Sequence, residues 1–300
     1  HGTVFIGQPG TGKTMCIWYL LMHMIREKQV VLLHMSTFET VLFYHDQVFV
    51  AAAALSSLSL PHYCADEWDF SQVCIWSLFD IPVGHHTPDI VWKAICYPVT
   101  APSPSDRDVM KHFIKSRVPY LGGLPLWTLK ELRDAYPLHL KYMKLIGILQ
   151  NYIDHWSSAV PKGPFGSILA ALKEEYGDDK PESVEHAWQT LMDIVIFHLG
   201  YAPRDVFSGM SALGQMKALH LSALEVVTYA QLQEIVVTFK TEAQLPDNNH
   251  RIVCISPHRR DTDDVVIWDI DFKSLWIAKE VSRRLAGERG LIPSSSLTDR

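Results

Sequence analysis

The sequence predicts an α/β fold with three layers and a parallel sheet, followed by a mostly helical region and a small C-terminal strand–helix unit. In the first part, short apolar runs bounded by turn residues alternate with helical patterns. From about Pro137 onward, apolar residues recur three or four positions apart, which predicts helices. We therefore expect a core domain at residues 1–137, a helical lid at 138–249, a strand–helix extension at 250–290 and a disordered tail at 291–300.

The composition narrows the class of protein. The 300 residues are 48% hydrophobic and 20% charged, which predicts a folded chain of one large or two ordinary domains. The net charge of −6 argues against a protein that coats nucleic acid, although a local basic patch would allow nucleic-acid contact. The longest apolar stretch, near residues 48–60, falls short of the ~20 residues that a membrane span needs, so we expect no membrane partner.

The cysteines indicate the cellular compartment, and the first residues indicate where the natural chain begins. Five scattered cysteines without a CxxC pair argue against disulfides and a zinc site. This favours an intracellular location, in the cytoplasm or the nucleus. Because the chain begins at His1 and a strand pattern follows at once, we expect the natural N-terminus to lie upstream.

Residues 7–14, near the N-terminus, form the motif that most clearly indicates a function. An apolar run at residues 3–6 precedes it, and a helical pattern follows from Met15. Glycines let a backbone wrap around a phosphate, with N–H groups pointing inward at a helix start. Lys13 would then reach the β- and γ-phosphates of ATP, and the Thr14 hydroxyl would bind Mg²⁺. The motif is Gly7-Gln8-Pro9-Gly10-Thr11-Gly12-Lys13-Thr14, which fits G-x-x-x-x-G-K-[ST] and predicts a P-loop; the alternative is a glycine-rich turn without a ligand.

A second signal is the apolar run at residues 73–80, which ends in Asp80. It predicts a buried parallel strand with a carboxylate at its C-terminal end, where ligands of open α/β sheets bind. Asp80 would hold Mg²⁺ with Thr14, or it is a solvated strand end. The next residue is Ile81, whereas many hydrolases of this kind place Glu there. The base would then be Asp80 itself or a loop acid, for which Glu39, Asp66 and Glu67 are the candidates.

Further strands complete the predicted sheet. A core strand is expected at residues 30–34, a hairpin at 40–50 and another strand at 91–97. After this last strand, Thr100 or Ser103 would contact the γ-phosphate, unless they are turn residues only. The basic residues between 107 and 117 form a solvated helix face or a contact with phosphate or a partner.

The second half is predicted to be helical. Thr128 and Glu131 predict a capping box at a helix start. The turn Gly200-Tyr201-Ala202-Pro203-Arg204 would place Arg204 over the γ-phosphate, or leave it as a surface arginine. Two strands near residues 250–257 and 265–272 and a helix at 272–286 end the chain. The long helices are expected at residues 138–156, 165–176, 183–199 and 210–230.

With these motifs in order, the chain resembles the P-loop ATPase module of the retrotransposon hot spot and Crinkler-type proteins of fungi, oomycetes and trypanosomatids. The resemblance spans most of residues 3–286 and implies an ATPase with an additional strand in its sheet. It implies that Lys13 contacts phosphate, that Thr14 and Asp80 bind Mg²⁺, and that Arg204 is the lid arginine. Such modules are often joined to a nuclease-like domain, which is not evident in these residues. The segments that carry it are GQPGTGKT (7–14), IWYLL (17–21), VVLLH (30–34), TVLFYHDQVFV (40–50), CIWSLFDI (74–81), PVTAPSPSDR (98–107), LPLWTLKEL (124–132) and GYAPRDVF (200–207).

Three functions fit this sequence. The first is Mg²⁺-dependent ATP hydrolysis coupled to movement of the lid or of a protein partner. The second is a switch that responds to ATP or ADP with little turnover, which Ile81 favours. The third, a small-molecule kinase, fits less well because residues 138–200 contain no arginine. The absence of an [NT]KxD motif disfavours a Ras-type GTPase.

Overall fold

A computed structural model describes residues 1–34, 40–51, 74–80, 96–102, 119–242, 249–259 and 266–288. The chain forms two compact units: His1–Pro125 with Ser256–Asp269, and Leu126–Ile255 with Ile270–Arg300. The first change of unit therefore falls at Pro125, while the sequence predicted a domain boundary at 137. Several predictions lie outside the described residues, namely those for Glu39, Asp66, Glu67, Ile81, Ser103, the basic residues 107–117 and the tail 291–300.

The first unit contains a seven-stranded sheet, and the predicted α/β fold with a mostly parallel sheet is confirmed. Strand β1 pairs in parallel with β6 and β7, and β5 pairs in parallel with β2 and β6. The predicted hairpin is present and adds two antiparallel strands at one edge. The order is β4 (Gln47–Ala51), β3 (Thr40–Tyr44), β2 (Val31–His34), β5 (Ile75–Phe79), β6 (Cys96–Thr100), β1 (Gly2–Gly7) and β7 (Pro119–Leu124).

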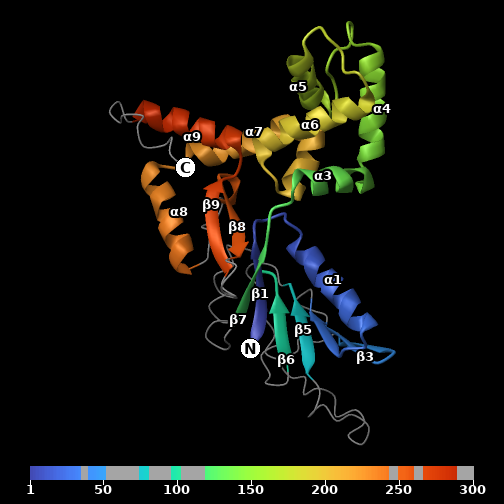
Figure 1. Ribbon diagram of the computed structural model, residues 1–300, viewed down its shortest axis with the longest axis vertical. Coiled ribbons are helices and arrows are strands. Elements are labelled where there is room, and N and C mark those ends of the chain that lie inside the picture. Colours follow the sequence, from blue (N-terminus) through green and yellow to red (C-terminus); the bar gives the residue numbers. More distant parts are fainter. Residues whose placement is uncertain are drawn as a thin grey trace, which may run out of the picture. The chain divides into compact units, whose positions relative to one another are not determined.

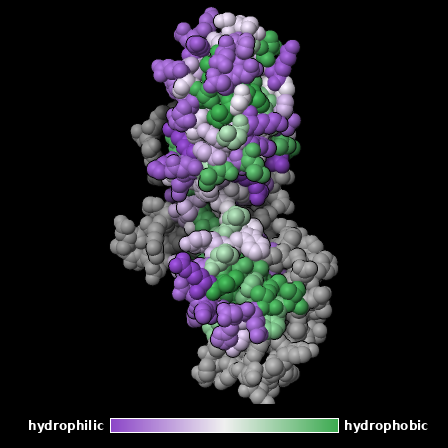
Figure 2. All heavy atoms as spheres, turned by 90° about the vertical axis from the view of Figure 1, so that its right-hand side faces the viewer, coloured by the Kyte–Doolittle hydropathy of each residue, from purple (hydrophilic) through white to green (hydrophobic). Residues whose placement is uncertain are grey.

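Helix α1 (Lys13–Arg26) lies beside this sheet (Figure 1). Its residues Ile17 and Leu21 pack with Leu78 and Val99 of the central strands in one buried cluster. The spacing of four residues places both side chains on one face of the helix. The opposite face is also apolar but exposed, and Figure 2 shows hydrophobic atoms gathered over this part of the surface. Its exposed residues are Met15, Trp18, Tyr19 and Met22.

Strand β4, at one edge of the described sheet, carries three consecutive exposed apolar residues. They are Val48, Phe49 and Val50. Because side chains alternate along a strand, both faces of this edge are apolar.

Strand β7 was not predicted from the sequence, because Pro119, Gly122 and Gly123 are unusual within a strand. Packing accounts for one of these glycines. A methyl group at Gly123 would lie 2.1 Å from Cβ of Pro257, a residue of β8 (Val253–Arg259). Strand β8 pairs with β9 (Val266–Phe272) in a separate two-stranded sheet. Only a residue without a side chain fits beneath Pro257.

The second unit is mainly helical, as predicted. The Thr128–Glu131 capping box is confirmed, with the Thr128 N–H donating to Glu131 Oε2 at 2.7 Å. The sequence did not predict the first part of α7, which begins at Pro203, whose fixed φ suits the first helical position. A kink at Ala212, with φ of −150° and ψ of 44°, divides α7 close to the predicted helix start at residue 210. The helical elements are α3 (Leu129–Ala135), η4 (Tyr136–Leu138), α4 (Tyr142–Asp154), α5 (Gly166–Tyr176), α6 (Val184–Leu199), α7 (Pro203–Glu225), α8 (Tyr229–Glu242), η5 (Asn249–Arg251) and α9 (Leu275–Glu288).

The core of this unit lies between its helices. The fully buried side chains of Leu145, Leu149, Ile168 and Leu191 come from α4, α5 and α6 and share one cluster. No helix in the described part of the chain combines the length and apolar character that crossing a bilayer requires.

A buried ion pair fixes the start of α7. Lys273, whose side chain is 3% exposed, pairs with Asp205 in the first turn of that helix. The backbone of Lys273 also lies against Gly200, where φ is +77° and a methyl group would be 2.0 Å from the Lys273 carbonyl oxygen. Beside it, Ser274 Oγ donates to the His198 carbonyl at 2.8 Å. The α6–α7 turn is thus fixed by the segment that follows β9.

His220 of α7 is buried close to this ion pair. Its Nδ1–H donates to the Arg251 carbonyl at 2.9 Å. Its Nε2 is buried without a hydrogen-bond partner among the described residues. Burial, and then the positive charge of Lys273, lower the pKa of His220 to about 4.

This lowered pKa predicts a loss of stability in mild acid. The unfolded chain binds a proton at His220 near pH 6.5, whereas the folded chain does so only near pH 4. Above about pH 6.5, His220 is neutral in both states and does not affect stability. As the pH falls to 4, protonation of His220 in the unfolded chain lowers the free energy of unfolding by up to about 3 kcal/mol. We expect urea unfolding between pH 7.5 and 4.5 to show a weaker pH dependence for His220→Gln. The exposed His23 offers a control, His23→Gln, and equal slopes for wild type and His220→Gln would contradict the prediction.

Candidate functional site

The loop between β1 and α1 is tightly curled. Gly10 has φ of 88° and Gly12 has φ of 97°, both in the left-handed region that favours glycine. The backbone N–H and the hydroxyl of Thr11 both donate to the Gln8 carbonyl, at 3.2 and 2.8 Å. At Gly7 a methyl group would lie 2.9 Å from the Leu124 carbonyl oxygen of β7. The glycines of the motif are therefore required by backbone conformation and by close approach of the neighbouring strand.

Lys13 turns back over this loop. It is the first residue of α1 and is largely buried. Its ammonium donates to the carbonyl oxygens of Gly7 at 2.9 Å and Gln8 at 3.2 Å. A positive charge is thus held against the loop, next to a helix N-terminus whose cap, Gly12, provides no side-chain hydrogen bond. The arrangement suits an anion.

The structure brings the two predicted metal ligands together. Asp80 follows the last residue of β5, and its backbone N–H donates to the His34 carbonyl of β2 at 3.2 Å. The Thr14 hydroxyl, one residue after Lys13, donates to Asp80 Oδ2. Two oxygen donors from separate elements therefore meet beside the loop, and hard oxygen ligands suit Mg²⁺.

Thr100 is the last residue of β6. It is buried at the end of β6, where it pairs with Val4 and Phe79. Its neighbours Val99 and Ala101 pack on the cluster formed with α1, so alternation directs Thr100 to the other face of the sheet. Its phosphate contact stays a prediction.

Arg204 belongs to the second unit. It is exposed in the first turn of α7, between buried Pro203 and paired Asp205. Its predicted phosphate contact also stays a prediction.

Sequence reasoning missed the side chain of His34. This residue ends β2 and is buried, with Nδ1 2.7 Å from Thr40 Oγ1. Nε2 is buried without a partner in the described part of the chain, and burial lowers the pKa of the ring. The signal was present, because a histidine ending an apolar strand beside the strand of Asp80 is a polar residue in a core position.

The described residues hold no group of three or more His, Cys, Asp or Glu side chains that could bind a metal ion by themselves. The chain matches no model of a known protein family, and it matches no curated protein. The resemblance to retrotransposon hot spot and Crinkler-type proteins stays a prediction that rests on the motifs.

The loop geometry predicts opposite effects of two Gly→Ala substitutions. Gly12 and Gly147 both have open space around a new methyl group, but Gly12 has φ of +97° and Gly147 lies inside α4. Gly12→Ala should lower the free energy of unfolding by about 1–2 kcal/mol, because a side chain is strained in that region. Gly147→Ala should raise it by about 0.5–1 kcal/mol. Chemical denaturation of both variants checks this, and a stabilised Gly12→Ala would contradict the loop conformation.

Proposed function

We propose that this chain binds Mg²⁺·ATP at residues 7–14 and hydrolyses it. The observation that carries the proposal is the meeting of three groups: the Lys13 ammonium on the loop carbonyls, the Thr14 hydroxyl, and the Asp80 carboxylate that accepts its hydrogen bond. A cation and two oxygen ligands at a helix start are the parts that phosphoryl transfer uses.

The strand order supports the same proposal. Strand β6 lies between β1, which leads into the loop, and β5, which ends at Asp80. An extra strand between these two is what the resemblance to additional-strand ATPases implies. All three strands run in parallel, so their C-terminal ends lie at one edge of the sheet.

Each residue has a distinct proposed role. The backbone N–H groups of Gly10 to Lys13 would bind phosphate oxygens, and the Lys13 ammonium would exchange its carbonyl partners for them. Thr14 and Asp80 would hold Mg²⁺, which when bound neutralises charge on the phosphates. Arg204 would offset charge on the γ-phosphate, as the resemblance implies. The attacking water needs a base, which Asp80 or an acid outside the described residues would supply.

The second candidate is a nucleotide-dependent switch, and the observation that favours it is Ile81. Directly after Asp80, this position holds an apolar side chain that cannot orient water. ATP would then bind with little turnover, and exchange of ATP for ADP would change the binding of a partner.

Phosphate release and ATP binding, measured side by side, separate these candidates. Lys13→Ala should lower phosphate release by about 100-fold or more, because it removes the cation that faces the phosphates. Asp80→Asn should retain ATP binding without Mg²⁺ and lose the gain in affinity that Mg²⁺ gives. Lys144→Ala, an exposed lysine on α4, is the matched control.

Each outcome decides between functions. Turnover that depends on Lys13 supports the hydrolase. Lys13-dependent ATP binding without turnover supports the switch. Unchanged binding and turnover in Lys13→Ala would overturn the site itself.

A further inference from the structure

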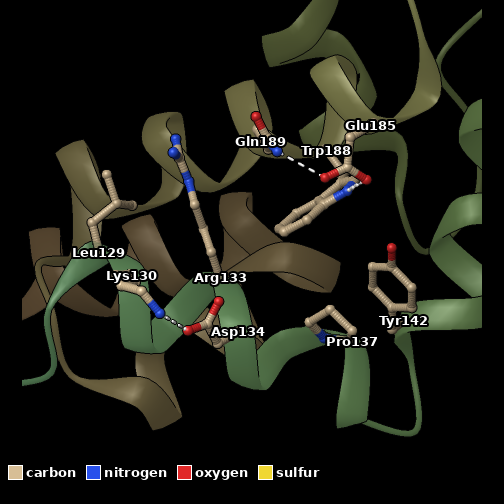
Figure 3. Close-up of a pocket in the computed structure, with 9 residues that line it drawn as sticks. All are labelled: Leu129, Lys130, Arg133, Asp134, Pro137, Tyr142, Glu185, Trp188 and Gln189. Atoms are coloured by element: carbon tan, nitrogen blue, oxygen red, sulfur yellow. Dashed lines mark hydrogen bonds and ion pairs between the residues drawn. The ribbon is translucent and has the colours of Figure 1, made fainter.

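The helical unit has an open cavity on its surface that the proposed ATP site does not use. Its volume is about 730 Å³, and residues of α3, η4, α4 and α6 line it. Figure 3 shows two different ends. Tyr142, Trp188, Glu185 and Gln189 gather at one end, while Lys130 and Asp134 form an ion pair at the other.

The carboxylate of Glu185 is held in place without a cation. Its Oε2 accepts a hydrogen bond from Trp188 Nε1 and its Oε1 accepts one from Gln189 Nε2, both at 2.7 Å. Both donors are neutral. By contrast, Asp134 pairs with Lys130 at 2.5 Å, and Asp193 pairs with Arg133 at 2.9 Å. Within the described part of the chain, this exposed carboxylate, in the first turn of α6, therefore has an orientation but no ion pair, while Arg133, which also lines the cavity, is paired with Asp193.

Two aromatic rings, those of Tyr142 and the buried Trp188, lie beside this charge. The rings of Tyr142 and Trp188 lie edge to face, with centroids 5.8 Å apart. Burial, and then the charge of Glu185, raise the pKa of the Tyr142 hydroxyl. Aromatic faces beside a fixed carboxylate attract a cation through both the ring quadrupole and the charge.

The surface next to the cavity is apolar. Leu138 and Leu140 are 85% and 98% exposed, and Met143 is 75% exposed. These residues flank Pro137 and Tyr142, which line the cavity. Exposed apolar residues beside a polar cavity are typical of a surface that binds a peptide rather than a free small cation.

We propose that this cavity binds an arginine side chain within an extended segment of a partner protein. The planar guanidinium can donate two parallel hydrogen bonds to the two oxygens of Glu185 and can stack on an aromatic ring, whereas a lysine ammonium is a point charge. Apolar residues next to that arginine contact Leu138, Leu140 and Met143. This inference does not depend on ATP binding.

The test uses the full 300-residue chain and a small set of probes. The probes are N-acetyl-arginine amide, the neutral isostere N-acetyl-citrulline amide, and the tripeptide acetyl-Leu-Arg-Leu-amide. Binding is measured by NMR titration, with the indole N–H signal of Trp188 assigned through Trp188→Phe. The chain variants are Glu185→Gln and the matched control Glu175→Gln, an exposed glutamate on α5.

We expect the arginine amide to shift the Trp188 signal and the tripeptide to bind more tightly. Citrulline amide should bind the wild type at least about tenfold more weakly than arginine amide does. Arginine amide should bind Glu185→Gln more weakly by the same factor, because each change removes one charge of a charge-assisted pair. Glu175→Gln should bind as the wild type does. Equal binding of arginine and citrulline, or unchanged binding by Glu185→Gln, would overturn the proposal.

Two other results would overturn parts of it. A tripeptide no tighter than arginine amide would overturn the assignment to a peptide. Self-association of the chain that Glu185→Gln abolishes, measured by sedimentation, would make a second copy the occupant rather than a different partner.

Discussion

The site in the first unit depends on hydrogen bonding along both sides of β1. Parallel pairing with β6 holds Thr3 and Val4, and pairing with β7 continues up to Gly7, which lies opposite Leu124. The strand is paired with β7 up to its last residue, and the next residues curl at once. Lys13 then reaches back to the last strand residue, and Thr14 lies beside the strand end that carries Asp80. A loop without these two neighbouring strands would hold neither contact.

The parts of this arrangement that the sequence revealed are those in which local chemistry decides the structure. The spacing of the glycines at residues 7–12 and the apolar run that ends in Asp80 can be recognised without knowledge of the fold. Strand β7 could not be predicted, because its pairing with β1 overrides the low strand preference of Pro119 and its glycines. The direction of the Thr100 side chain was equally hidden, since it depends on the register with β1 and β5.

In the second unit, a buried pair of charged side chains defines a turn position that apolar packing alone would leave less defined. Lys273 and Asp205 are both largely buried, and such a pair adds little stability over two apolar residues of the same size. What it adds is a defined position for the α6–α7 turn, because neither charge tolerates separation from the other. The cavity beside α3 shows the opposite case, where one oriented carboxylate has been left without such a partner.

The apolar outer strand β4 has a practical meaning. Val48, Phe49 and Val50 stand on both faces of the outermost described strand. An edge of this kind is a template for β-strands of other molecules. In concentrated solution this exposed apolar edge favours aggregation. Replacing Val48 or Val50 with lysine is therefore the simplest way to improve solubility, since both side chains lie outside the core.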